Sequence, residues 1–195
     1  MPIPGIVASG ISGHLTAPSS FYSIATVTAA GGETSLTFSS IPGTYKSLQI
    51  RGIVKDTSTT DYSATAAQFY ILPNNDTTTT YSDHSLYGNT STANAYGQTS
   101  GNGFMMYGSY ISSNATFANI YGVVIIDIQD YASTTKYKTS RAFVGADANG
   151  SGTTNRNVAL NSGLYQTTTA ITSLVIKPAA TAFAAGSTFA LYGIN

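Results

Sequence analysis

The chain has 195 residues, of which only 8% are charged, and its eight basic residues balance its eight acidic ones. Ordinary domains carry about 25% charged residues, and nucleic-acid binding needs a basic face, so this composition excludes a nucleic-acid-binding function. The length suits one domain with a sizeable core. A neutral surface favours a subunit that is largely covered in an assembly, with a neutral secreted domain as the alternative.

The residue types favour β-structure. Polarity comes from 29 Thr and 24 Ser, with 14 Tyr, while Glu33 is the single glutamate. Thr and Tyr suit pleated surfaces, and glutamate is a helix former. The absence of cysteine excludes disulfides and thiolate metal sites, and favours assembly in a reducing cytoplasm. We expect no signal peptide and no membrane span, because no run approaches about 20 apolar residues.

Residues 1–20 are predicted to form an extended N-terminal arm. Three of the six prolines fall here, together with three glycines, and neither a helical nor a strand pattern is present. A free arm would leave its apolar side chains in water, whereas burial of each would contribute about 1.5–3 kcal/mol. We therefore expect the arm to contact a neighbouring subunit or the surface of a larger assembly through Ile3, Ile6, Val7 and Ile11.

Residues 21–195 are predicted to form a single β-sandwich domain. Short runs of β-type residues alternate with Gly, Asn, Ser and Thr breaks at the spacing of a sandwich. The predicted strands are Phe21–Thr28, Ser35–Ser39, Tyr45–Lys55, Gln68–Leu72, Tyr81–Tyr87, Phe104–Ile111, Phe117–Gln129, Tyr137–Gly145, Asn157–Gln166, Ile171–Lys177 and Thr188–Ile194.

Two of these runs predict which side chains face the core. In Tyr45–Lys55 the alternation places Leu48, Ile50 and Val54 on one face, with Gln49 and Arg51 on the other. In the second run the inward residues are Val124, Ile126 and Ile128, and the outward ones are Asp127 and Gln129. Residues 123–126 are apolar on both faces, which predicts a central strand that is covered on each side.

Three low-complexity stretches are predicted to be loops: Thr57–Thr60, Thr77–Thr80 and Asn89–Gly103. No repeat of fixed period is visible, so a propeller or β-helix is not expected. Eight to eleven strands without a helix predict an all-β, jelly-roll-like β-sandwich.

Several segments resemble virion proteins of tailed bacteriophages. They are Pro4–Leu15, Leu36–Arg51, Ile128–Thr139, Ser162–Ile176 and Ser187–Ile194. Together they extend over nearly the whole chain, and none is a catalytic motif. The resemblance implies a structural protein on the outside of a phage particle, and it leaves head, neck and tail open.

The sequence offers little for catalysis, and we predict that the protein is not an enzyme. Glycoside hydrolysis needs two carboxylates at a defined separation, yet most Asp residues fall in predicted turns. The consecutive residues Asp83, His84 and Ser85 cannot form a triad with one another, because neighbours on a strand point to opposite faces. An enzyme that cleaves polysaccharide is kept only as the last of the alternative functions.

No metal or cofactor is expected. With His14 and His84 as the two histidines, a histidine metal site is not predicted. Residues Asp147–Gly152 match the first half of a calcium loop, but Val158 stands where a bidentate glutamate is required. A hairpin loop is the preferred interpretation of this segment.

The tyrosines allow two interpretations, a sugar-binding surface or a core and subunit interface, of which we prefer the second. They are Tyr62, Tyr70, Tyr81, Tyr87, Tyr96, Tyr107, Tyr110 and Tyr121. We predict a capsid decoration or cement-type protein, homotrimeric and attached to phage capsid or tail proteins. The alternative is a tail-fibre or baseplate module that binds a host surface glycan.

Overall fold

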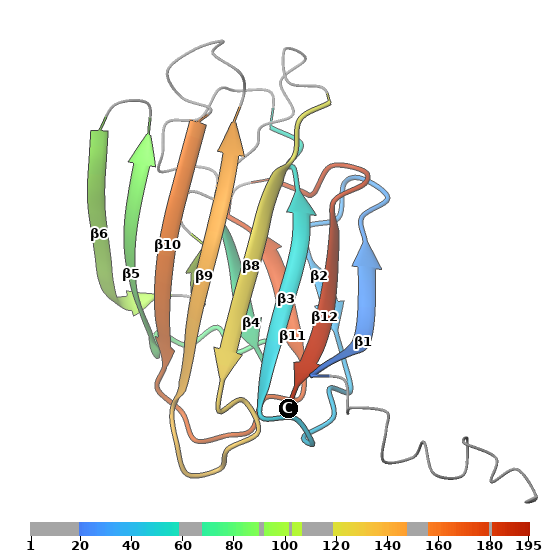
Figure 1. Cartoon of the computed structure of the whole chain (residues 1–195), viewed down its shortest axis with the longest axis vertical. Coiled ribbons are helices and arrows are strands. Elements are labelled where there is room, and N and C mark those ends of the chain that lie inside the picture. The colour runs from blue at the N-terminus through green and yellow to red at the C-terminus, as the bar shows by residue number, and fades with distance from the viewer. Residues whose placement is uncertain are drawn as a thin grey trace, which may run out of the picture.

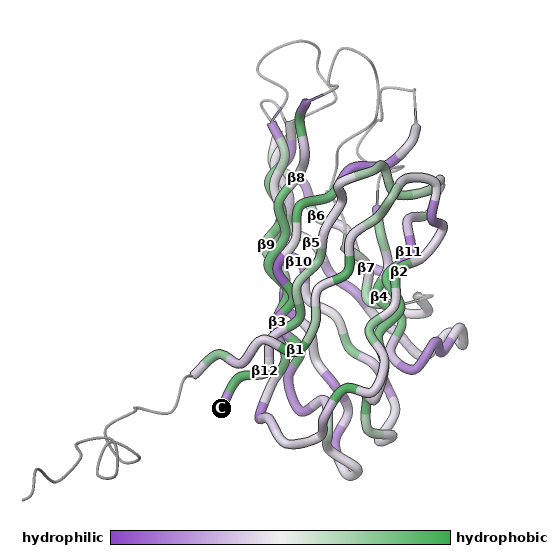
Figure 2. Tube along the Cα trace, turned by 90° about the vertical axis from the view of Figure 1, so that its right-hand side faces the viewer, coloured by the Kyte–Doolittle hydropathy of each residue, from purple (hydrophilic) through white to green (hydrophobic). Residues whose placement is uncertain are grey.

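The computed structural model describes residues 20–58, 68–89, 92–101, 103–106, 119–147, 156–179 and 181–195. These residues form twelve β-strands in two antiparallel sheets that pack face to face (Figures 1 and 2). No helix occurs in these ranges, and hence none that could cross a membrane. The all-β sandwich is confirmed, while a jelly-roll topology stays a prediction.

The two sheets differ in size. The smaller one contains, in spatial order, β2 (Leu36–Phe38), β11 (Leu174–Pro178), β4 (Phe69–Pro73) and β7 (Phe104–Met106). The larger one contains β1 (Phe21–Thr28), β12 (Thr188–Ile194), β3 (Ser47–Val54), β8 (Gly122–Gln129), β9 (Lys138–Asp147), β10 (Arg156–Tyr165), β5 (Tyr81–Asn89) and β6 (Thr92–Gly101). Figure 1 looks onto the outer face of the larger sheet, with the smaller sheet behind it.

The core lies between the sheets and follows the period-two pattern of the strands. Leu48 and Ile50 of β3 are fully buried, whereas the next residue, Arg51, is exposed. On β8 the inward residues Val124, Ile126 and Ile128 are buried, as the alternation predicts. Because apolar burial is the main favourable term in folding, this interior determines the sandwich.

The stretch Asn89–Gly103 corrects one prediction. It was expected to be a loop, but Thr92–Gly101 forms β6, which pairs with β5 at the edge of the larger sheet. The polar residues of β6 are mostly exposed. An edge strand needs no apolar face when solvent reaches both sides, and polar residues there discourage pairing with other chains. With β6 the described residues contain twelve strands, more than the predicted eight to eleven.

The expectation that β8 is covered on both sides is also wrong for the single chain. Its outward residues Val123 and Ile125 remain 54% and 44% exposed. The smaller sheet covers one face of the larger sheet only (Figure 2), so the second apolar face of β8 is left at the surface.

Candidate interaction surface

Seven apolar side chains lie together on the outer face of the larger sheet. In register, Ile125 is opposite Phe143, Phe143 is opposite Leu160, and Ile53 of β3 is opposite Val123. The exposed fractions of the seven lie between 44% and 58%. We call them the apolar rows: Ile53, Val123, Ile125, Phe143, Val158, Leu160 and Leu86.

The apolar rows are unusual for a solvated sheet. On a sheet with one face in water, the outward positions are normally polar. Here five neighbouring strands, from β3 to β5, place large apolar groups outward in adjacent positions. The surface is also hollowed in two places, one beside Ile53 and Val123 and the other beside Leu86 and Leu160. A contiguous apolar patch of this kind is typical of a protein-binding surface.

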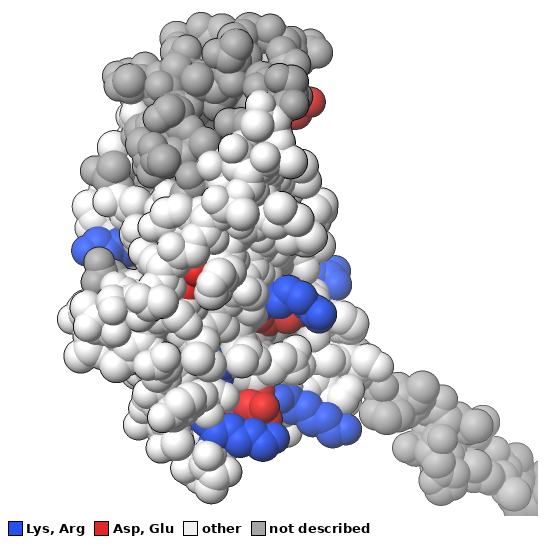
Figure 3. Space-filling model, turned by 90° about the vertical axis from the view of Figure 1, so that its left-hand side faces the viewer, with Lys and Arg blue, Asp and Glu red and all other residues white. Residues whose placement is uncertain are grey.

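A polar band borders the apolar rows on the same face. The Gln49 Nε2 donates a hydrogen bond to Asp127 Oδ1 at 2.8 Å, and Arg141 Nη2 lies 3.6 Å from Asp127 Oδ2. The Arg51 Nε donates to Gln49 Oε1 at 2.7 Å, and its guanidinium lies 5.0 Å from the centre of the Phe21 ring. An apolar centre with a polar rim is the usual anatomy of a protein interface. On the side of the molecule that Figure 3 shows, charged side chains are few among the described residues.

The residues Asp83, His84 and Ser85 take the alternate faces that the sequence predicts. The side chains of Asp83 and Ser85 are buried, whereas His84 is exposed. Inside the sandwich, Gln98 Nε2 donates to Asp83 Oδ2 at 3.2 Å, and Ser85 Oγ donates to Asn161 Oδ1 at 2.6 Å. These bonds connect β5 to β6 and β10.

Two of the carboxylates fall in the predicted strands Tyr81–Tyr87 and Phe117–Gln129 and not in turns. Asp83 and Asp127 lie within strands, on opposite faces of the larger sheet. Each is held by polar neighbours on adjacent strands, which is why a strand position tolerates it. Opposite faces also prevent this pair from flanking one glycosidic bond.

The segment that matches half of a calcium loop lies only partly within the described residues. Asp147 ends β9, while residues 148–155 lie outside the described ranges. Among the described residues, no three His, Asp or Glu side chains are close enough together to hold a metal ion. His14 falls outside the described residues.

The tyrosines named in the sequence analysis lie in several parts of the fold and do not form one surface. Tyr81 is buried in the core, Tyr87 packs against it, and the Tyr121 hydroxyl donates to the Ala185 carbonyl at 2.8 Å. Tyr70 is half-buried and Tyr96 is 38% exposed, and none of these five belongs to the apolar rows. The other three, Tyr62, Tyr107 and Tyr110, lie outside the described residues.

Two stacked tyrosines of the core, Tyr81 and Tyr165, both contact Asp76. The rings of Tyr81 and Tyr165 are 4.7 Å apart and nearly parallel. The Tyr165 hydroxyl donates to Asp76 Oδ2 at 2.6 Å, and the Tyr81 hydroxyl donates to the Asp76 carbonyl at 3.1 Å. Burial raises the pKa of both phenols, and the neighbouring Asp76 charge adds to the effect. Burial opposes ionisation of Asp76, but hydrogen bonds from Thr78 and Tyr165 outweigh it and lower the pKa of this carboxyl.

These tyrosines predict alkaline instability. Their pKa is raised in the fold, so the unfolded chain loses its phenolic protons first, from about pH 10. The stabilisation is therefore complete below pH 10 and is lost as the pH rises through the folded pKa values, by up to about 1.4 kcal/mol per pH unit for each tyrosine. Urea unfolding at pH 9, 10 and 11 measures this decline. Tyr165→Phe should show a shallower decline, and equal slopes would contradict the assignment.

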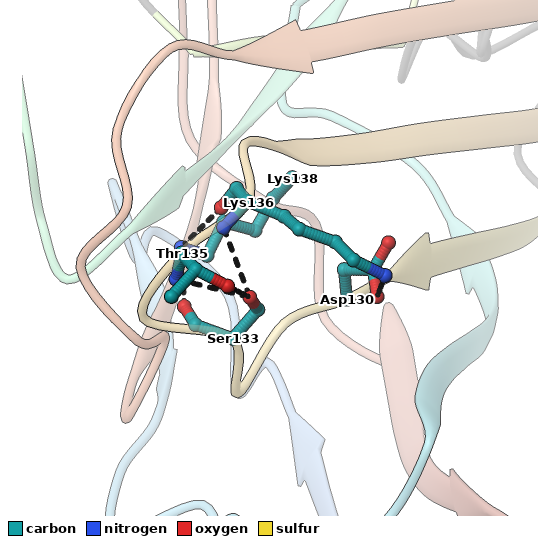
Figure 4. Close-up of polar contacts among 5 residues, drawn as sticks. All are labelled: Asp130, Ser133, Thr135, Lys136 and Lys138. Atoms are coloured by element: carbon teal, nitrogen blue, oxygen red, sulfur yellow. Dashed lines mark hydrogen bonds and ion pairs between the residues drawn. The ribbon is translucent and has the colours of Figure 1, made fainter.

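The loop between β8 and β9 encloses a buried ammonium group (Figure 4). Lys138 is fully buried, and its Nζ donates to the carbonyls of Ser133 at 2.8 Å and of Lys136 and Thr167 at 3.1 Å. Ser133 Oγ accepts bonds from the backbone N–H of Thr135 and Lys136. Burial lowers the pKa of Lys138, against an opposing effect of the Asp130 charge. The group uses all three of its protons on backbone carbonyls, two in this loop and one at Thr167 after β10, which indicates a structural role.

The arm residues Ile3, Ile6, Val7 and Ile11 lie outside the described residues, so their contacts stay a prediction. The apolar rows, in contrast, were missed as a surface. The signal was present in residues 123–126, where both faces of the strand are apolar. Comparison of the chain with protein-family models and with curated proteins found no match.

Proposed function

We propose that this protein is a structural subunit of a tailed-bacteriophage particle, of the capsid decoration type, that works by binding other protein chains. The observation that carries the proposal is the group of apolar rows, seven large side chains exposed on one sheet face. A face of this composition is stable in water only at a cost, and binding to another protein surface removes that cost.

Two features of the sequence support the particle location. Five segments resemble phage virion proteins, and the low charge suits a subunit that spends its lifetime packed among others. The arm supplies the attachment in this proposal, through Ile3, Ile6, Val7 and Ile11, and the sandwich supplies contacts with further subunits. The expected assembly is a homo-oligomer on the virion surface.

A tail-fibre or baseplate module that binds a host glycan is the second candidate. The outer position of Tyr192, whose ring lies 6.4 Å from that of Phe21, provides an aromatic pair on the larger sheet that could stack on a sugar. Copy number separates the two candidates. Electron microscopy of labelled particles should find hundreds of copies on the head for a decoration protein, and a few per tail for a fibre module.

Deletion of residues 1–15 should abolish attachment to the particle and leave the sandwich folded. Among the described residues the first strand begins at Phe21, and the fully buried core residues lie from Ala29 onward. The truncated protein is mixed with particles that lack it, and the bound fraction is measured after sedimentation.

A matched variant replaces Ile3, Ile6, Val7 and Ile11 by serine and keeps the length of the arm. It should bind as poorly as the deletion, while its circular dichroism stays that of the full chain. Full binding by both variants would place attachment on the sandwich, and loss of the β-sheet spectrum would place the arm in the core.

A further inference from the structure

We propose that the outer face of the larger sheet pairs with the same face of a second copy of this chain. The two copies are related by a two-fold axis that runs parallel to the strands and passes between β8 and β9. This inference rests on the proposed function in one respect only, that the face binds protein. Attachment to particles is measured separately, so either proposal can fail alone.

The first argument is the match between apolar side chains. A rotation about this axis places β8 of one copy over β9 of the other, and β3 over β10, while each cross-strand row keeps its height. Because Ile125 and Phe143 share a row, Ile125 meets the partner's Phe143. Ile53 and Val158 share the next row with Val123 and Gly145, so Ile53 meets the partner's Val158. Apolar groups thus cover apolar groups at these four positions, whereas Leu160 meets the partner's Arg51, whose aliphatic stem covers it.

The second argument is charge complementarity. Asp127 of β8 and Arg141 of β9 occupy one row of the polar band. The same rotation places Asp127 over the partner's Arg141 and Arg141 over the partner's Asp127. Four charges of alternating sign then meet at the axis, which favours this register over any register that brings like charges together.

The third argument concerns where the other exposed apolar groups lie. Of the ten large apolar side chains exposed on the described residues, seven form the apolar rows and Phe21 lies on the same outer face. The other two, Tyr96 and Tyr137, lie on the inner side of β6 and in the β8–β9 loop. A head-to-tail contact needs a second, different apolar surface, whereas a two-fold contact needs only one self-complementary face. The distribution fits the two-fold contact.

The available area is large enough. Strands lie about 4.8 Å apart, and side chains on one face repeat about every 6.8 Å, so four rows across the seven strands from β1 to β5 cover roughly 900 Å². A stable interface needs about 800 Å² from each partner. The apolar rows alone cover only roughly 300 Å², so the polar band must take part in the contact.

The mass of the full chain in solution tests the pairing. Light scattering coupled to size exclusion, at roughly 100 μM protein, should give twice the chain mass of 20.2 kDa. Phe143→Glu should weaken association at least about thirtyfold, as loss of a central contact does. Thr37→Glu adds the same charge on the exposed face of β2 and should leave the dimer unchanged.

Two further measurements test the axis itself. Asp127→Arg and Arg141→Asp should each dissociate the dimer, and the two changes combined should restore it. Because the chain has no cysteine, Gln129→Cys provides a unique thiol on β8, which the axis places roughly 11 Å from its copy in the partner. A short bis-maleimide should crosslink this variant, and Lys177→Cys on β11 of the smaller sheet should not crosslink.

A protein that stays monomeric at all concentrations overturns the proposal. This includes a monomer in which the chain's own N-terminal residues protect the outer face from hydrogen exchange. A trimer, the state expected from the sequence, overturns it as well. Association that survives Phe143→Glu or both single charge reversals shows that another surface is used.

Discussion

Replacement of Lys138 by methionine is expected to lower the free energy of unfolding by about 3–5 kcal/mol. Methionine keeps the length of the side chain but donates no hydrogen bond, so the carbonyls of Ser133, Lys136 and Thr167 lose a shared donor. Each buried acceptor left without a partner costs about 1–3 kcal/mol. For a chain of this size the melting temperature should fall by roughly 10 °C.

Lys136→Met is the matched control, since it removes the same charge from the same loop. The ammonium group of Lys136 is exposed and lies 3.1 Å from Asp130 Oδ1, also near the surface. An exposed ion pair contributes at most about 1 kcal/mol. Urea unfolding followed by circular dichroism compares the two variants. Equal losses would show that the burial of Lys138 is not what stabilises the loop.

The role of Lys138 illustrates what the sequence could not provide. Its position at the start of a strand was close to the predicted one, because β-type residues follow it. Its burial depends on Thr167, 29 residues further along the chain, and on two carbonyls of a loop whose shape is not encoded in any short pattern. Long-range contacts of this kind follow from how the strands associate.

The strands themselves were predictable where the alternation is strong. The bounds of β1 and β12 coincide with the predicted runs, and the apolar residues predicted to face inward on β3 and β8 are all buried. β6 was missed because its Ser, Thr, Asn and Gly residues show no alternation, and only its pairing with β5 makes it a strand. For β8 the two apolar faces were recognised, but a sequence contains no information on which neighbour covers the second face.

Truncation of a phenylalanine should cost much more stability on the inner face of the larger sheet than on its outer face. Phe189→Ala is expected to lower the free energy of unfolding by about 3–5 kcal/mol, as truncation of a buried phenylalanine does. Phe189 of β12 is fully buried, and its ring lies 5.6 Å from the rings of both Phe69 and Phe183. It also fills the space beside Gly52, where a Cβ atom would come within 2.6 Å of the ring. Three fixed neighbours leave little room for the cavity to collapse.

Phe143→Ala is the control of the same residue type on the outer face. Because Phe143 is half-exposed in the single chain, its truncation should cost the monomer less than about 1 kcal/mol. Both variants must be unfolded at low protein concentration, since association stabilises the folded chain by mass action and would hide the difference. At high protein concentration, the loss of unfolding free energy for Phe143→Ala should approach that for Phe189→Ala, because the substitution then also weakens the dimer. A large loss for Phe143→Ala at every concentration would mean that this ring stabilises the monomer itself, and the outer face would then be part of the core.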